Sequence, residues 1–215
     1  MRSILYVLVP ALLLGCGGGG ASGGAPEETA GCGPYPDEAS SPYSLPYEVG
    51  TSSFVSQANC TDGSHKTGIP DQYAYDFLMP IGTLITASRP GTVTRFYDGY
   101  ADNTGVPGEE NVVGITHTDG SVALYFHLAQ DGALVELQQT VGTGEVIALS
   151  GNSGNSLEPH LHVQVQDTSA SINHHHRGDG DSIPFRLSDI THIRDGAGTT
   201  EQLSLLRRND RVRTD

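Results

Sequence analysis

Six short segments rich in β-branched and aromatic residues occupy the middle of the chain, separated by Gly, Pro and Asn-Asp turns. They span residues 83–87, 92–97, 111–117, 121–127, 146–149 and 161–166. No stretch shows the sustained periodicity of an amphipathic helix. The pattern therefore predicts an all-β fold, a single antiparallel sandwich or small barrel. Between two of the segments, Asp119 and Gly120 are typical of the two-residue turn of a β-hairpin.

The first 15 residues have the features of a signal peptide, with Arg2 ahead of an apolar run too short to span a bilayer comfortably. The run closes with LLGC at residues 13–16, which resembles the lipobox of bacterial lipoproteins. The resemblance implies cleavage before Cys16, acylation of that cysteine and a lipid anchor in a membrane. In a Gram-negative cell, Gly17 after the cysteine implies the outer membrane, with the domain facing the periplasm. A simple secreted protein is the alternative.

Residues 16–44 are largely Gly, Ser, Ala, Pro and Glu, and such a segment cannot bury enough apolar surface to offset its ordering entropy. We expect a flexible linker, with a reach of roughly 30 Å that holds a domain clear of a membrane. With Cys16 acylated, Cys32 and Cys60 remain as an even pair in an oxidising compartment. A disulfide is the default for such a pair, and two free thiols are the alternative.

Residues 45–195 are long enough to fold as one domain with a proper core. The formal charge of −14 argues against nucleic acid as a partner, because nucleic acid requires basic patches. Residues 196–215 form a polar tail that holds four of the eleven basic residues. We expect this tail to be disordered, with contact to a membrane or cell wall as the alternative, and the domain to be a monomer.

The tripeptide His160-Leu161-His162 opens the last of the β-rich segments. Because side chains alternate along a strand, both imidazoles and Gln164 share one face, and the apolar residues between them share the other. One histidine can bind a metal ion while the other reaches a water on that ion. A polar strand face that carries two histidines by chance is the alternative.

A third histidine, His127, ends the segment 121–127. In this segment alternation groups Leu124 and Phe126 on one face, which we expect to face the core. His127 then lies on the opposite face with Tyr125, outside the core-facing set. A third histidine on a polar sheet face favours a functional site over chance.

Candidate metal ligands also lie upstream, in residues 64–80. Asp76 is flanked by Tyr75 and Phe77, so it enters an apolar neighbourhood where a bare carboxylate is costly. A metal ion or a strong hydrogen-bond partner would relieve that cost, and an aspartate that caps a turn before Pro80 is the alternative. A catalytic zinc takes three ligands of the His, Asp and Glu types and keeps one position for water.

Several motifs, in this order, resemble the lysostaphin-like (LytM-type) zinc endopeptidases of bacterial cell-wall peptides. They are His65 with Ala74-Tyr75-Asp76-Phe77, Gly82-Thr83, Pro90-Gly91-Thr92-Val93, Tyr125-Phe126-His127-Leu128, Ser150-Gly151-Asn152-Ser153-Gly154 and Pro159-His160-Leu161-His162. The resemblance spans about residues 46–166 and implies the family's all-β, duplicated-hybrid-motif fold. It implies one zinc ion per chain held by His65, Asp76 and His162. It also implies two catalytic histidines that do not bind the metal, His127 and His160.

The first metal ligand departs from the commonest family spacing. Many members have that ligand four residues before the aspartate, where this chain has Gln72. Other members use a longer gap, with a Ser-His pair upstream of Tyr-Ala-x-Asp. The pair Ser64-His65 fits this variant, so His65, 11 positions before Asp76, is the expected ligand.

The resemblance implies a zinc metalloendopeptidase that hydrolyses peptide cross-links or bridges of peptidoglycan. Zinc lowers the pKa of a bound water towards 7 and polarises the scissile carbonyl, while His127 and His160 can accept a proton, bind the oxyanion or protonate the leaving amine. One alternative is a catalytically degenerate relative that binds the cell wall or activates an amidase. Another is a zinc-binding protein that uses His174–His176. We expect that cluster to be a solvated loop, and His117 and His192 to be ordinary side chains.

Overall fold

The structure, a computed structural model, describes residues 32–36, 41–167, 181–188, 190–194, 197–199, 206 and 210–214. The predicted signal segment 1–15, Cys16 and the cluster His174–His176 lie outside these ranges. Within the described ranges there is no α-helix, and the one helical element is a single 3-10 turn, η2 (Gly63–His65). In the same ranges, no helix has both the length and the apolar character needed to cross a membrane.

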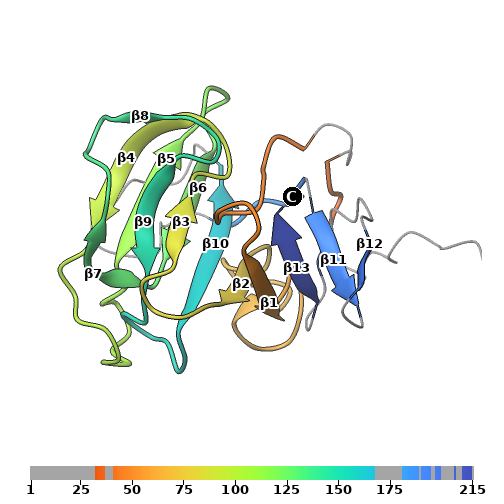
Figure 1. The fold of residues 1–215 in the computed structure, drawn as a ribbon, viewed down its shortest axis with the longest axis horizontal. Coiled ribbons are helices and arrows are strands. Elements are labelled where there is room, and N and C mark those ends of the chain that lie inside the picture. The colour runs from red at the N-terminus through yellow and green to blue at the C-terminus, as the bar shows by residue number, and fades with distance from the viewer. Residues whose placement is uncertain are drawn as a thin grey trace, which may run out of the picture.

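Antiparallel strands form two sheets, which confirms the predicted all-β fold class (Figure 1). The larger sheet runs, from edge to edge, β12 (Ala197–Thr199), β11 (Ile190–Arg194), β13 (Arg211–Thr214), β1 (Ser52–Gln57), β2 (Tyr75–Leu78), β10 (His160–Gln166), β6 (Val122–Phe126), β5 (Val112–Thr116), β4 (Gly91–Tyr97) and β8 (Thr140–Val141). The smaller sheet has the order β3 (Leu84–Thr86), β9 (Val146–Ser150) and β7 (Leu128–Ala133). The strands β2, β10 and β6 are therefore neighbours near the middle of the larger sheet.

One hydrophobic cluster joins the two sheets into a sandwich. Ile85 and Ile147 enter it from the smaller sheet, and Ile115, Tyr125 and Leu161 enter it from the larger sheet. All five side chains are fully buried. The face of the larger sheet that lies away from this core is the one that remains for a functional site.

A second, smaller cluster lies on that other face of the larger sheet and consists of Val112, Leu124 and Phe126. The expected core face of β6 is therefore wrong, because Tyr125 enters the main core and Leu124 and Phe126 do not. Both faces of β6 are apolar, so alternation alone could not identify the one that faces the main core.

The hairpin between β5 and β6 has a loop of residues 118, 119 and 120, one residue longer than predicted. His117 N donates to Ser121 O at 2.8 Å, and Gly120 N donates to His117 O at 2.9 Å. Gly120 has a φ of 87°, the left-handed conformation that a glycine adopts without strain. This is the arrangement of a three-residue hairpin loop with a glycine at its last position.

The end of the predicted linker is packed on the domain. Cys32 forms a disulfide with Cys60, and Tyr43 is buried in the main core. Ser44 N donates a hydrogen bond of 2.8 Å to Ser88 O. The prediction of a flexible linker is therefore wrong for residues 32–36 and 41–44, since a cross-link and an aromatic anchor offset the entropy of ordering them.

The end of the predicted disordered tail is a strand. Residues Arg211–Thr214 form β13, which pairs with both β1 and β11. Val212 is fully buried in the main core, while the guanidinium of Arg211 lies 5.4 Å from the ring centroid of Phe54. The prediction of disorder is therefore wrong for 211–214, where backbone pairing on two sides and an apolar anchor outweigh the charge of the segment. It is also wrong for 197–199, which form β12 and pair with β11.

Candidate metal centre

Asp76 and His162 are cross-strand neighbours on the face of the larger sheet that lies away from the main core. β2 and β10 pair with Asp76 directly opposite His162. Tyr75, Phe77 and Leu161 beside them enter the main core, so alternation turns the carboxylate and the imidazole to the other face. Opposed residues of antiparallel strands have Cβ atoms about 5 Å apart, which brings the two polar ends into contact.

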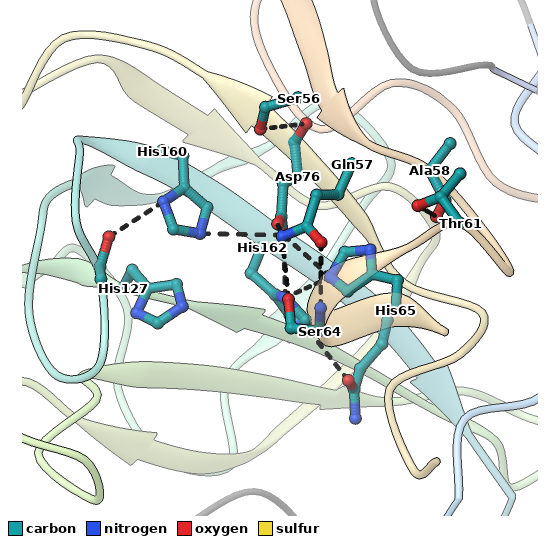
Figure 2. A network of polar contacts seen from close by, with 12 residues as sticks. Ser56, Gln57, Ala58, Thr61, Ser64, His65, Asp76, His127, His160 and His162 are labelled. Atoms are coloured by element: carbon teal, nitrogen blue, oxygen red, sulfur yellow. Dashed lines mark hydrogen bonds and ion pairs between the residues drawn. The ribbon is translucent and has the colours of Figure 1, made fainter. Parts of the chain in front are cut away.

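His65 reaches the same point from outside the sheet. It is the last residue of η2, and its side chain is fully buried. Gly63, which starts this turn, has a φ of 90° that a residue with a Cβ rarely adopts. The ring of His65 packs edge-on against that of His162 (Figure 2), and the two ring centroids are 5.0 Å apart.

Three atoms, one from each side chain, form a compact triangle. His65 Nε2 lies 3.3 Å from Asp76 Oδ1 and 3.3 Å from His162 Nδ1, and His162 Nδ1 lies 2.9 Å from Asp76 Oδ1. In a tetrahedral zinc site with bonds of about 2.0–2.1 Å, two ligand atoms are separated by about 3.3 Å. The triangle therefore has the dimensions of one face of such a tetrahedron.

The chemistry of these donors also fits a divalent cation. Asp76 Oδ1 is buried and accepts no hydrogen bond of good geometry, although ring nitrogens of three histidines lie within 4 Å of it. His162 Nε2 lies 2.9 Å from Gln164 Oε1, so it carries the proton and leaves Nδ1 with a lone pair. Metal-binding imidazoles almost always donate their other ring N–H to an acceptor, and the amide oxygen of Gln164 is that acceptor here.

The ionisation of the cluster favours an anionic carboxylate. Burial alone would raise the pKa of Asp76, but the facing imidazoles of His65 and His162 outweigh it and hold the pKa well below its ordinary value. Burial alone would lower the pKa of His162, but the carboxylate raises it above its ordinary value. A cation at the centre of the triangle would take the place of the proton that these groups otherwise share.

His127 stands beside the triangle on the corner between β6 and β7. Its φ of 59° is unusual for a residue with a side chain, and it breaks the alternation of β6. Its Nδ1 donates to Ser153 O at 2.8 Å, which leaves Nε2 free to accept a proton. Burial and the neighbouring His160 and His162 lower the pKa of His127 to about 3, so its ring is neutral at pH 7.

His160 is the fifth predicted residue at this point. Its ring lies 4.5 Å from that of His127, measured between centroids, and its Nε2 lies 3.8 Å from Asp76 Oδ1. Its Nδ1 is 2.9 Å from Glu158 O, a carbonyl that only accepts, so Nδ1 carries the proton. Ser156 Oγ, 3.0 Å from the same Nδ1, also donates to Glu158 O and steadies this contact.

A groove of about 310 Å³ opens along these side chains. Asp76, His127, His160 and His162 all line it, together with Ser56, Gln57, Ser64 and residues 155–158. Leu157 on this rim is fully exposed. Two corners of the triangle and the two further histidines therefore face the groove, while His65 is fully buried behind them.

The structure thus brings His65, Asp76, His162, His127 and His160 together, as the family resemblance implied. Sequence reasoning missed the residues that hold them, such as Gln57 beside Asp76 and Ser153 beside His127. Gln164 was placed on the correct face by alternation, but without a role. Among the other histidines, His117 is buried and its Nδ1 donates to Pro90 O at 2.8 Å, which is an ordinary structural role. The side chain of His192 lies outside the described part of the chain.

Comparison with known proteins identifies the domain. Residues 71–174 match the model of Peptidase family M23. The chain is 35% identical over 98 residues to the DD-carboxypeptidase/endopeptidase Mpg of Neisseria meningitidis serogroup B, covering 46% of this chain and 20% of that protein. It is 37% identical over 90 residues to the peptidoglycan DD-endopeptidase ShyA of Vibrio cholerae, covering 42% and 19%. The match thus spans about a fifth of the length of these relatives.

One further relative and one solved structure are similar to this chain. The glycyl-glycine endopeptidase ALE-1 of Staphylococcus capitis is 32% identical over 104 residues, covering 48% of this chain and 26% of that protein. The solved catalytic domain of lysostaphin from Staphylococcus simulans is 28% identical, with a TM-score of 0.41 over 56% of this chain and 83% of that one. Asp76, His127, His160 and His162 all fall inside the matched residues 71–174, and His65 precedes them. Residues 71–174 of this chain therefore correspond to a domain of Peptidase family M23.

Proposed function

We propose that this protein is a zinc-dependent endopeptidase that hydrolyses peptide cross-links or bridges of bacterial peptidoglycan. The observation that carries the proposal is the triangle of His65 Nε2, Asp76 Oδ1 and His162 Nδ1, with edges of 2.9–3.3 Å beside an open groove. The names of the relatives ShyA and ALE-1 support the substrate class. Because these names specify different bonds, the proposal extends to peptidoglycan peptides and not to one bond.

The five side chains of the site have two proposed roles, metal binding and proton transfer. His65, Asp76 and His162 would hold the zinc ion, which when bound lowers the pKa of a water and polarises the scissile carbonyl. His127 and His160 each carry a proton on Nδ1, held by a backbone carbonyl, and offer Nε2 as a base. Either ring can take a proton from the attacking water and return it to the leaving amine.

The decisive experiment measures zinc content and muropeptide digestion on the same preparations. We expect the intact chain to hold one zinc ion and to digest muropeptides. His65→Ala should lose both properties, because it removes a corner of the triangle. His127→Ala should keep zinc and lose turnover, because its ring lies beside the triangle and not in it. His117→Gln, at a buried histidine outside the site, is the matched control and should keep both.

Two results would overturn the proposal. One is stoichiometric zinc with full digestion in His65→Ala, which would mean that the ligands are other residues. The second is zinc and peptidoglycan binding by the intact chain without any cleavage, which is the expected behaviour of a non-enzymatic cell-wall-binding relative.

We further propose that Cys16 carries a lipid that anchors the protein in a membrane, facing the periplasm if the cell is Gram-negative. The support is the sequence LLGC at residues 13–16 after an apolar run. Labelling cells with palmitate and fractionating them tests this proposal. The intact protein should be labelled and sediment with membranes, and Cys16→Ala should be unlabelled. Equal labelling of the two would refute it.

A further inference from the structure

Gln57 lies in one row with two of the three residues of the triangle. β1 pairs with β2 so that Gln57 is opposite Asp76, and Asp76 is opposite His162 on β10. The register of β1 shifts between Val55 and Gln57, which indicates a β-bulge at the end of the strand. Bulges re-aim side chains, and this one brings the amide of Gln57 to the face that carries the triangle.

The amide of Gln57 makes three hydrogen bonds, one to Asp76 of the triangle and two to Ser64, the residue next to His65. Its Nε2 donates to Asp76 Oδ2 at 2.8 Å and to Ser64 Oγ at 2.8 Å. Its Oε1 accepts from Ser64 N at 3.1 Å. The orientation of the amide is unambiguous, because a carboxylate only accepts and a backbone N–H only donates. Figure 2 shows Gln57 between Asp76 and Ser64.

The turn that carries His65 is built against this amide. A Cβ added to Gly63 would lie 2.7 Å from Gln57 Oε1, closer than two such atoms approach. Gly63 also has a φ of 90°, so both its conformation and its lack of a side chain fit the turn to the glutamine. Residues 63–65 therefore pack closely against the side chain of Gln57.

We propose that Gln57 is a positioning residue that joins the two segments carrying the first two metal ligands, His65 and Asp76. The inference rests on the proposed zinc site. By engaging Oδ2, the amide fixes the rotation of the carboxylate, which is otherwise soft, and directs Oδ1 to the triangle. By holding Ser64 at both N and Oγ, it fixes the residue next to His65. One side chain thus spans the gap of 11 positions between these ligands.

Zinc affinity in the full chain tests the inference, measured by competition with a chelating dye. The variant is Gln57→Met, which keeps the length of the side chain and removes all three hydrogen bonds. Partners of metal ligands typically change affinity by about 10–100-fold, and we expect a loss in this range. We also expect a changed visible spectrum with Co²⁺, because the carboxylate can then rotate. The matched control is Gln72→Met, in the loop between His65 and Asp76. The Oε1 of Gln72 accepts from Gly68 N at 2.7 Å, and this residue does not line the groove.

The outcomes separate this inference from the proposed function. If the intact chain binds no zinc, both are overturned. If it binds one zinc ion and Gln57→Met binds with the same affinity, only the role of Gln57 is overturned. An equal loss in Gln72→Met would also overturn it, since the effect would then be general to the loop. If circular dichroism shows that Gln57→Met does not fold, Gln57→Asn takes its place. The side chain of Asn is one methylene shorter and cannot reach both Asp76 and Ser64. Unchanged zinc affinity in Gln57→Asn would therefore also overturn the role of Gln57.

Discussion

The substitution Ser153→Ala should destabilise the protein more than its size suggests. Ser153 is fully buried, and its Oγ accepts from Asn111 N at 3.0 Å and donates to Leu128 O at 2.7 Å. Without the hydroxyl, Leu128 O still accepts from Asn111 Nδ2 at 3.0 Å, but the N–H of Asn111 loses its partner. A buried donor without a partner costs about 1–3 kcal/mol, and the lost bond to Leu128 O costs about 1 kcal/mol more. We expect the free energy of unfolding to fall by about 2–4 kcal/mol.

Ser150 provides a matched control for this prediction. It is equally buried, and its Oγ also accepts from a backbone N–H, Thr83 N at 3.0 Å, and donates to a carbonyl, Pro80 O at 2.7 Å. After Ser150→Ala, however, Thr83 N still donates to Pro80 O at 3.2 Å, and Thr83 Oγ1 still donates to the same oxygen at 2.8 Å. No backbone group is left without a partner, so we expect a loss of only about 0.5–1.5 kcal/mol.

Equilibrium unfolding in urea compares the two variants. The chain has no tryptophan, so circular dichroism is the suitable probe. Both variants should unfold with the m-value of the intact protein, and the midpoint should fall further in Ser153→Ala. Equal losses in the two variants would refute the reasoning, because they would show that the orphaned N–H of Asn111 costs nothing.

Three further predictions concern other parts of the molecule. Replacing Cys32 and Cys60 by Ser removes a cross-link between residues with a sequence separation of 28, and we expect the free energy of unfolding to fall by about 3–4 kcal/mol. The unfolding midpoint should be lower than in the oxidised protein, and an unchanged midpoint would contradict this. Burial lowers the pKa of His117, so below about pH 6.5 the unfolded state binds more protons than the folded state. The stability of the intact chain should therefore decrease as the pH is lowered, and it should decrease less steeply in His117→Gln. Parallel stability profiles of the two proteins would contradict this. Zinc at about 100 times its Kd should raise the free energy of unfolding by about 2.7 kcal/mol in the intact chain, and the same rise in His65→Ala would contradict the proposed ligands.

The strand that carries two of the site histidines was predictable because its two faces differ chemically. In β10, Leu161 and Val163 enter the main core, while His162 and Gln164 lie on the other face. Strict alternation of apolar and polar residues leaves one register, because a slip by one residue would bury the polar set in the main core. The face of His162 therefore followed from local sequence.

His127 shows where local alternation fails. Extended backbone would place it on the face of Tyr125, in the main core. Instead its φ of 59° turns the chain from β6 of the larger sheet into β7 of the smaller one, and the ring swings to the groove. The contact that holds it there, from Nδ1 to Ser153 O, spans 26 positions. A window of a few residues contains neither the turn nor its partner. Alternation therefore indicates a site at His127 from a face that is in fact the core face, and its role beside the metal ligands is implied by the resemblance to a family.

The first metal ligand is the residue of the site that local sequence predicts least well, because residues 72 and 65 both precede Asp76 at spacings found in the family. Three residues separate 72 from 76 and ten separate 65 from 76, and closing the longer loop costs only about 1 kcal/mol more. That is the worth of about one ordinary hydrogen bond, and Gln57 supplies three between the two ends of the loop. Spacing along the chain therefore hardly discriminates between the two positions. In the structure the side chain of Gln57 bridges the two ends of the longer loop, and such a bridge is visible only in three dimensions.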